Sequence, residues 1–231
     1  MHPWLSFLST LSQSAVNLGH RQVVLLSGPL DWSWPLLKPW LAQHKNNAII
    51  SQNIPTSIDG KQLPANKPGN LLGYESDNVV FNCHEGLYPD ALTAISGTLI
   101  CGGVFFILCP DTQLWPNHTD DFARNRAPHT PEAIPTPNNY HMVRRLLQKS
   151  KSHNVHLIKQ GDELPSLPAT PLAVWQAPSN LTRDQKQVFQ GIYNTFSLKK
   201  YIHVITADRG RGKSHLLGKL LENLISPGID N

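Results

Sequence analysis

The sequence predicts an α/β protein with a doubly wound, mainly parallel sheet flanked by helices, followed by the incomplete start of a RecA-like P-loop module. First, apolar segments of strand length alternate with helix-length segments from residue 21 to about 160. Second, these strand segments are continuously apolar, which is typical of strands buried on both faces. Third, an apolar segment near residue 204 runs into a glycine-rich loop and then an apolar helix.

Each element of the first part follows from its own pattern. Five segments have the length and apolar character of buried strands: residues 23–27, 48–51, 78–83, 104–109 and 155–158. Four segments predict helices: residues 5–17, 35–43, 90–99 and 139–149. In the third of these, apolar side chains recur on one helical face, and we expect Gly102 and Gly103 to end the helix.

Two polar, proline-containing segments interrupt this alternation. Residues 111–137 predict a long surface excursion, and residues 161–178 contain prolines at positions 165, 168, 171 and 178. We therefore predict an N-terminal α/β domain over residues 1–160, a proline-rich linker over 161–180, and the truncated start of a P-loop ATPase domain over 181–231. In this last part we expect a helix capped by Thr182, a strand over 201–205 and a helix over 214–225.

The segment from Ala207 to Ser214 has the pattern of a phosphate-binding loop. Backbone N–H groups of such a loop surround a phosphate, Lys213 reaches the outer phosphates, and the Ser214 hydroxyl meets Mg²⁺. Ala207 stands where the strict pattern has glycine, while Gly210 and Gly212 still permit close approach of the backbone. Strand, loop and helix in the correct order favour nucleotide binding over a chance match.

The predicted nucleotide contacts extend beyond the loop. Gln185, in the helix before the strand, resembles the glutamine that reads an adenine edge in helicase-type motors, whereas Arg209 and Arg211 either contact phosphates or are solvated. The predicted cofactor-binding residues are Gln185, Ala207, Asp208, Arg209, Gly210, Arg211, Gly212, Lys213, Ser214, His215 and Leu216. No catalytic residue is predicted, because a metal-holding carboxylate, a water-positioning residue and an arginine contact come from later strands. We expect the chain to be the front of a larger protein.

Charge and composition restrict the other functions. Residues 1–180 carry twelve basic and twelve acidic residues, so the net charge of +4 comes from the segment around the loop.

Cys83, Cys101 and Cys109 predict buried free thiols, and the eleven histidines form no cluster with metal-ligand spacing. No signal peptide is evident and the longest apolar run is too short for a bilayer, which predicts a cytosolic protein without membrane contact. A second phosphate site after residues 27–28 lacks the dinucleotide fingerprint.

The order of these segments resembles the N-terminal half of the bacterial tRNA(Met) cytidine acetyltransferases. The most specific part is the arginine-containing loop, because Arg-Gly-Arg-Gly-Lys-Ser is unusual among P-loops. The segments that carry the resemblance are residues 23–28 with Trp32, 90–99 with Gly102 and Gly103, 140–147, 182–185 and 206–214.

The resemblance implies a modular enzyme that forms N4-acetylcytidine at the wobble position of elongator tRNA(Met). It would use acetyl-CoA, and ATP or GTP hydrolysis with Mg²⁺ would support the transfer. Nothing in the chain matches the acetyl-CoA site, so we expect the chain alone to be inactive. Two alternatives remain at this point: a non-catalytic module that binds RNA or a partner, and a fragment of an unrelated P-loop ATPase.

Overall fold

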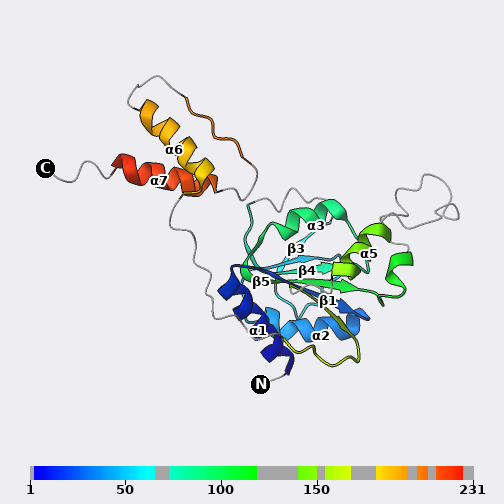
Figure 1. Cartoon of the computed structure of the whole chain (residues 1–231). Coiled ribbons are helices and arrows are strands. Elements are labelled where there is room, and N and C mark those ends of the chain that lie inside the picture. Colours follow the sequence, from blue (N-terminus) through cyan, green and yellow to red (C-terminus); the bar gives the residue numbers. More distant parts are fainter. Residues whose placement is uncertain are drawn as a thin grey trace, which may run out of the picture. The chain divides into compact units, whose positions relative to one another are not determined.

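A computed structural model describes residues 3–65, 73–118, 140–149, 154–167, 181–196, 202–207 and 212–225. The chain divides into two compact units, Met1–Trp175 and Gln176–Asn231 (Figure 1). The predicted linker falls largely in residues 168–180, outside the described residues.

The first unit is built on a six-stranded sheet with the order β3-β2-β4-β5-β1-β6. All of its strand pairs are parallel. The strands are β1 (Gln22–Ser27), β2 (Asn47–Ile50), β3 (Lys61–Leu63), β4 (Ser76–Asn82), β5 (Leu99–Cys109) and β6 (Val155–Lys159). This arrangement confirms the predicted doubly wound α/β fold.

Helices cover both faces of the sheet (Figure 1). On one face lie α1 (Pro3–Leu18) and α2 (Leu30–Leu41), and on the other lie α3 (Pro89–Ser96) and α5 (Tyr140–Lys149). Side chains of a strand alternate between faces, so Val24 and Leu26 pack in the cluster with α1 and α2, whereas Leu25 packs in the cluster with α3 and α5. Both clusters are buried, which explains why the strands are continuously apolar.

The five predicted strands of this unit are confirmed, with differences at their ends. β5 begins at Leu99, five residues before the predicted position, and the pairing of β4 with β5 shifts register between Ser76 and Asn78. β3 was missed because it is a three-residue edge strand whose first two residues, Lys61 and Gln62, are exposed. Short, charged edge strands protect a sheet from further pairing, but they lack an apolar signal.

Two helix predictions need correction. α2 begins at Leu30 rather than residue 35, and it contains Pro35 and Pro39. Burial of apolar side chains on its inner face outweighs the backbone hydrogen bonds that these prolines remove. α3 ends at Ser96, so the glycine pair does not terminate it.

The glycine pair lies instead in an irregular part of β5 against α1. Gly102 has a φ of +82°, its N–H donates to the His20 carbonyl, and its carbonyl accepts from Ser12 Oγ. A Cβ at this position would overlap Val16. Glycine is therefore required by backbone conformation and by close approach of the helix.

Two further expectations are corrected near β5. Cys101 is exposed rather than buried, because it lies in the irregular part of the strand. The predicted excursion at 111–137 begins as ordered structure: Trp115 opens a short 3₁₀ helix, η2 (Trp115–Asn117), and is buried in the core. Thr112 N donates to Ser27 Oγ, which ties this segment to β1. The remainder of the excursion lies outside the described residues.

The second unit contains α6 (Arg183–Phe196) and α7 (Lys213–Ile225), which contact each other. The strand predicted at 201–205 does not form over the described residues 202–207. Ile202 is 93% exposed and Val204 80% exposed. A strand needs a neighbour for its backbone groups, and no other strand occurs among the described residues of this unit. A RecA-like sheet therefore stays a prediction.

None of the helices described has the length and hydrophobicity required to cross a bilayer.

Candidate functional site

The two ends of the predicted phosphate loop are described, at Ala207 and from Gly212 onward, while residues 208–211 lie outside the described residues. Gly212 has a φ of +77°, a conformation that favours glycine. α7 starts at the next residue, and Leu216 N donates to the Gly212 carbonyl over 3.0 Å. The loop therefore ends at a helix N-terminus, where orphan backbone N–H groups and the helix dipole favour anions.

Lys213 connects the two ends of the loop. Its ammonium group donates to the carbonyl oxygen of Ala207, so the side chain reaches back from the first residue of α7 across the span of the loop. An ammonium has three donors on a flexible stem. In this position it can exchange a backbone carbonyl for phosphate oxygens within the same loop.

Gln185 lies beside the loop although it sits in the first turn of α6, well before the loop in the chain. Its Oε1 accepts from Thr182 N over 2.9 Å, and its own N–H donates to Thr182 Oγ1 over 3.3 Å. This reciprocal pair is a capping box, which confirms Thr182 as the N-cap of α6. A Cβ on Gly212 would lie 2.5 Å from Gln185 Nε2. Gln185 thus caps its own helix and also contacts the loop.

The remaining predicted residues in the first turn of α7 differ in their exposure to solvent. Ser214 and His215 are exposed, whereas Leu216 is buried together with Leu220. Asp208, Arg209, Gly210 and Arg211 lie outside the described residues.

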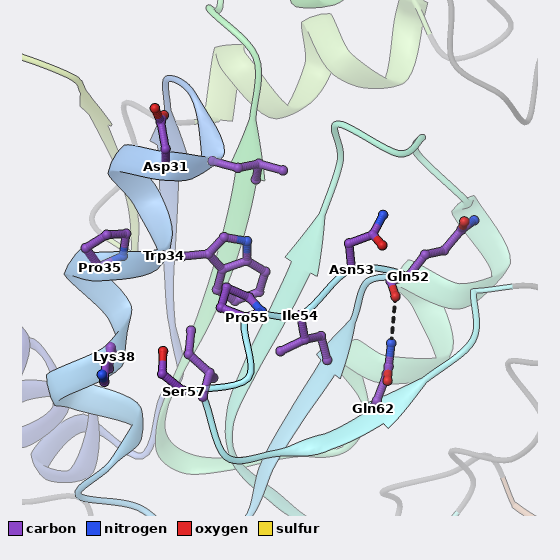
Figure 2. Close-up of a pocket in the computed structure, with 12 residues that line it drawn as sticks. Asp31, Trp34, Pro35, Lys38, Gln52, Asn53, Ile54, Pro55, Ser57 and Gln62 are labelled. Carbon is purple, nitrogen blue, oxygen red and sulfur yellow. Dashed lines mark hydrogen bonds between the residues drawn. The ribbon is translucent and has the colours of Figure 1, made fainter.

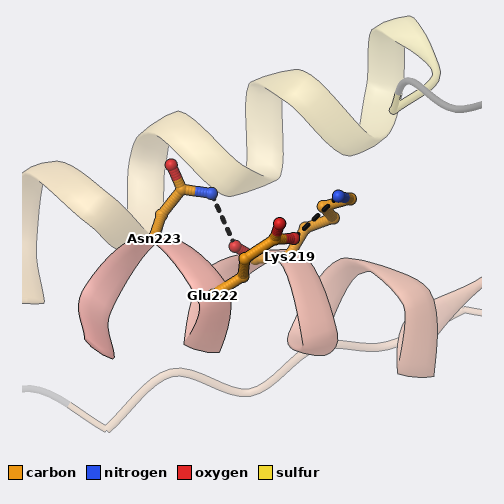
Figure 3. Close-up of polar contacts among 3 residues, drawn as sticks. All are labelled: Lys219, Glu222 and Asn223. Carbon is orange, nitrogen blue, oxygen red and sulfur yellow. Dashed lines mark hydrogen bonds and ion pairs between the residues drawn. The ribbon is translucent and has the colours of Figure 1, made fainter. Parts of the chain in front are cut away.

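Further along α7, Lys219 pairs with Glu222 at 2.7 Å, and Asn223 Nδ2 donates to the Lys219 carbonyl (Figure 3). This second lysine of the helix is engaged in an exposed pair worth less than about 1 kcal/mol. Lys219 therefore serves as a control for substitution of Lys213.

A second candidate site lies in the first unit, where β1 and β5 end. β1 continues into α2 on one face of the sheet, whereas β5 continues into η2 and α5 on the other face. A crevice of about 410 Å³ opens there, which we name the switch crevice. It is lined by Ser27, Gly28, Pro29, His84, Pro110, Asp111, Lys159, Gln160 and Asp162. Sequence reasoning considered residues 27–28 of this site but missed the other lining residues, because they follow strands that are far apart in the chain.

His84 is the unusual side chain of the switch crevice. Its Nε2 atom is buried and has no hydrogen-bond partner among the described residues. Burial lowers the pKa of His84 below its usual 6.5, and the charge of His118 acts in the same direction. Hydrogen bonding with the backbone at Gly28 and Cys109 and the charge of Glu85 raise the pKa, but burial outweighs them. The imidazole is therefore neutral at neutral pH.

A larger pocket of about 800 Å³ lies between α2 and the segment that follows β2 (Figure 2). Trp34 points from α2 toward Ile54 and Pro55, and Asp31 and Lys38 lie on the same helix (Figure 2). The amide of Gln62 donates to the carbonyls of Ser51 and Gln52. The buried polar side-chain atoms of this pocket are paired within the described residues, whereas His84 Nε2 in the switch crevice is not.

Glu85 holds the segment after β2 against the end of β4. Its carboxylate accepts from Ser51 Oγ over 2.8 Å, from Gln52 N over 2.6 Å and from Asn53 N over 3.3 Å. Asn82 Nδ2 donates to the same carboxylate over 3.0 Å. These bonds position one wall of the pocket, and they give Glu85 a structural role.

The parallel sheet covered on both faces places the chain in the doubly wound class of α/β proteins. Residues 1–160 match the sequence family described as tRNA(Met) cytidine acetyltransferase TmcA, N-terminal, and the chain belongs to this family.

Individual relatives agree with this assignment. A tRNA(Met) cytidine acetyltransferase TmcA from Pectobacterium atrosepticum is 31% identical, over 91% of this chain and 29% of its own length. The protein of the same name from Nitrosococcus halophilus is 26% identical, over 96% of this chain and 31% of its own length. One from Haloarcula marismortui is 28% identical over 75% of this chain. The chain spans about 30% of the length of the curated relatives that it matches.

Proposed function

We propose that this chain is the nucleotide-binding N-terminal portion of a tRNA(Met) cytidine acetyltransferase. Its loop, residues 207–214, would bind ATP or GTP with Mg²⁺ in support of acetyl transfer from acetyl-CoA to a cytidine of elongator tRNA(Met). The family assignment supports the reaction, because the relatives are named for it.

One observation carries the nucleotide assignment. The Lys213 ammonium, at the N-terminus of α7, donates to the carbonyl of Ala207 at the other end of the loop. The lysine, the positive-φ Gly212 and the helix N-terminus are the three groups that a phosphate chain requires from such a loop. Gln185 lies against Gly212, where it would contact the nucleotide.

Binding of Mg-ATP to the 231-residue chain tests the assignment. We expect Lys213→Ala to weaken binding at least about tenfold, because it removes charge-assisted hydrogen bonds to phosphate. Lys219→Ala is the matched control, since it removes an exposed lysine from the same helix. Isothermal titration calorimetry measures both. Equal affinity of wild type and Lys213→Ala would rule out this loop as the phosphate site.

We also expect the chain alone to transfer no acetyl group, because none of its segments matches an acetyl-CoA site. Incubation with radiolabelled acetyl-CoA, ATP and elongator tRNA(Met), followed by counting of the tRNA, measures this directly. Acetylated tRNA above the no-enzyme background would overturn the expectation.

A further inference from the structure

The capping box of α6 connects the end of a helix to the phosphate loop, because one of its two side chains also faces that loop. Thr182 Oγ1 accepts from Gln185 N over 3.3 Å, and Thr182 N donates to Gln185 Oε1 over 2.9 Å. These bonds satisfy two backbone N–H groups that the helix itself leaves without a partner. They also hold the Gln185 side chain in one position.

The orientation of the Gln185 amide follows from the group that faces it. A carboxamide carries an acceptor oxygen on one side and two N–H donors on the other. Because Thr182 N is a donor, it must face the oxygen, and the amide nitrogen points elsewhere. That nitrogen lies against Gly212: it would be 2.5 Å from a Cβ at this position, whereas the amide carbon would be 3.7 Å away. The capping box therefore directs the N–H donors of Gln185 toward the end of the loop.

The chemistry of this amide suits a nucleotide base better than a phosphate. Within the loop, Lys213 supplies the positive charge, and its ammonium reaches across the loop to the Ala207 carbonyl. Gln185 is neutral and carries donors and an acceptor side by side, which is the combination that recognises the edge of a base. Rotation of the amide by 180° would exchange donor and acceptor. Recognition of a base by Gln185 therefore requires that its amide is held in one orientation.

We propose that Thr182 is a positioning residue of the nucleotide site, which fixes the Gln185 amide so that this amide reads the base while the loop binds the phosphates. Thr182 itself touches no nucleotide and acts through Gln185. This role rests on the proposed nucleotide function of residues 207–214, and it adds the pair of residues that sets recognition of the base.

Binding of Mg-ATP and of inorganic triphosphate, which has no base, to the 231-residue chain tests this role by calorimetric titration. Thr182→Gly removes the hydroxyl acceptor but perturbs the helix little, because glycine is tolerated at the N-cap. We expect it to weaken binding of Mg-ATP about five- to tenfold and to leave triphosphate within about twofold of wild type. Thr182→Ser keeps the hydroxyl and should retain the wild-type affinity for both ligands.

A double-mutant cycle tests whether Thr182 acts through Gln185. Gln185→Met keeps an unbranched side chain of similar length but removes its donors and its acceptor, so it should weaken Mg-ATP binding by at least the same factor. In that background, Thr182→Gly should cause no further loss. Gln190→Ala is the control within α6, because the amide of this exposed residue donates to Asn194, and it should change neither affinity.

The two ligands distinguish failure of this role from failure of the phosphate loop. Unchanged Mg-ATP affinity in Thr182→Gly, or equal weakening of Mg-ATP and triphosphate, overturns the proposal, since the cap then only stabilises α6. Additive losses in the double variant also overturn it. Equal affinity of wild type for both ligands would exclude recognition of the base but leave the phosphate loop intact. Absence of binding of either ligand to wild type would refute the phosphate loop, and with it a role for Thr182.

Discussion

At the residue scale, Glu85 shows how one carboxylate can position a loop. Four hydrogen bonds converge on it from Ser51, Gln52, Asn53 and Asn82. We expect Glu85→Ala to lower the free energy of unfolding by about 2 kcal/mol, because it removes four hydrogen bonds and leaves the N–H groups of Gln52 and Asn53 without their carboxylate acceptor. Urea unfolding measures the change. Glu75→Ala, at an exposed position, is the control and should change stability by less than about 0.5 kcal/mol.

The cysteines differ in the environment of their thiols. Cys109 is buried, and burial together with the Asp111 charge raises the pKa of its thiol to about 12, so the reactive thiolate is scarce at neutral pH. Cys101 is exposed. We expect iodoacetamide to label Cys101 in the native chain and Cys109 only after unfolding, as followed by peptide mass spectrometry. Equal labelling rates in the native chain would contradict the buried position of Cys109.

At the element scale, Gly212 just before α7 and Gly218 within α7 have opposite requirements. Gly212 precedes the helix with positive φ and is crowded by Gln185, whereas a Cβ at Gly218 meets no atom within 4 Å. We expect Gly212→Ala to weaken Mg-ATP binding, since it strains the end of the loop. Gly218→Ala should keep binding intact and stabilise the helix by up to about 1 kcal/mol. Calorimetric titration and thermal unfolding followed by circular dichroism measure the two effects. Unchanged nucleotide affinity in Gly212→Ala would show that this conformation is not needed for binding.

At the scale of the whole molecule, two half-buried histidines make stability depend on pH. Burial lowers the pKa of His84 and of His156 below 6.5, so the unfolded chain binds more protons than the folded chain as pH falls. Their contribution to stability is therefore complete above the unfolded pKa and is lost as pH falls through 6.5 toward the folded pKa values. We expect the melting temperature to drop between neutral pH and about pH 5, and less steeply in His84→Phe. An equal slope in wild type and variant would contradict this role.

Much of the fold was predictable because burial on both faces leaves a local signal. The core strands appear as continuous apolar runs, such as residues 104–109 in β5. The polar edge strand β3 and the irregular start of β5 carry no such signal, since their conformation depends on neighbours. The opposite error occurred at residues 201–205, which have strand composition, although no partner strand is described in that unit. Of the loop, Lys213 contacts Ala207 and Gln185 lies against Gly212, and binding of a nucleotide by these residues stays a prediction.

The sequence by itself determined the alternation of strands and helices, the pattern of the loop that ends at α7, and the family resemblance. These features are local, because they depend on side-chain periodicity and on residues adjacent in the chain. Only the tertiary structure decided that β5 lies between β4 and β1. That order brings His84, Asp111 and Lys159 from three separate strand ends to one crevice. Strand order results from packing between distant segments, so the crevice and its unsatisfied histidine nitrogen appear only once the sheet is assembled.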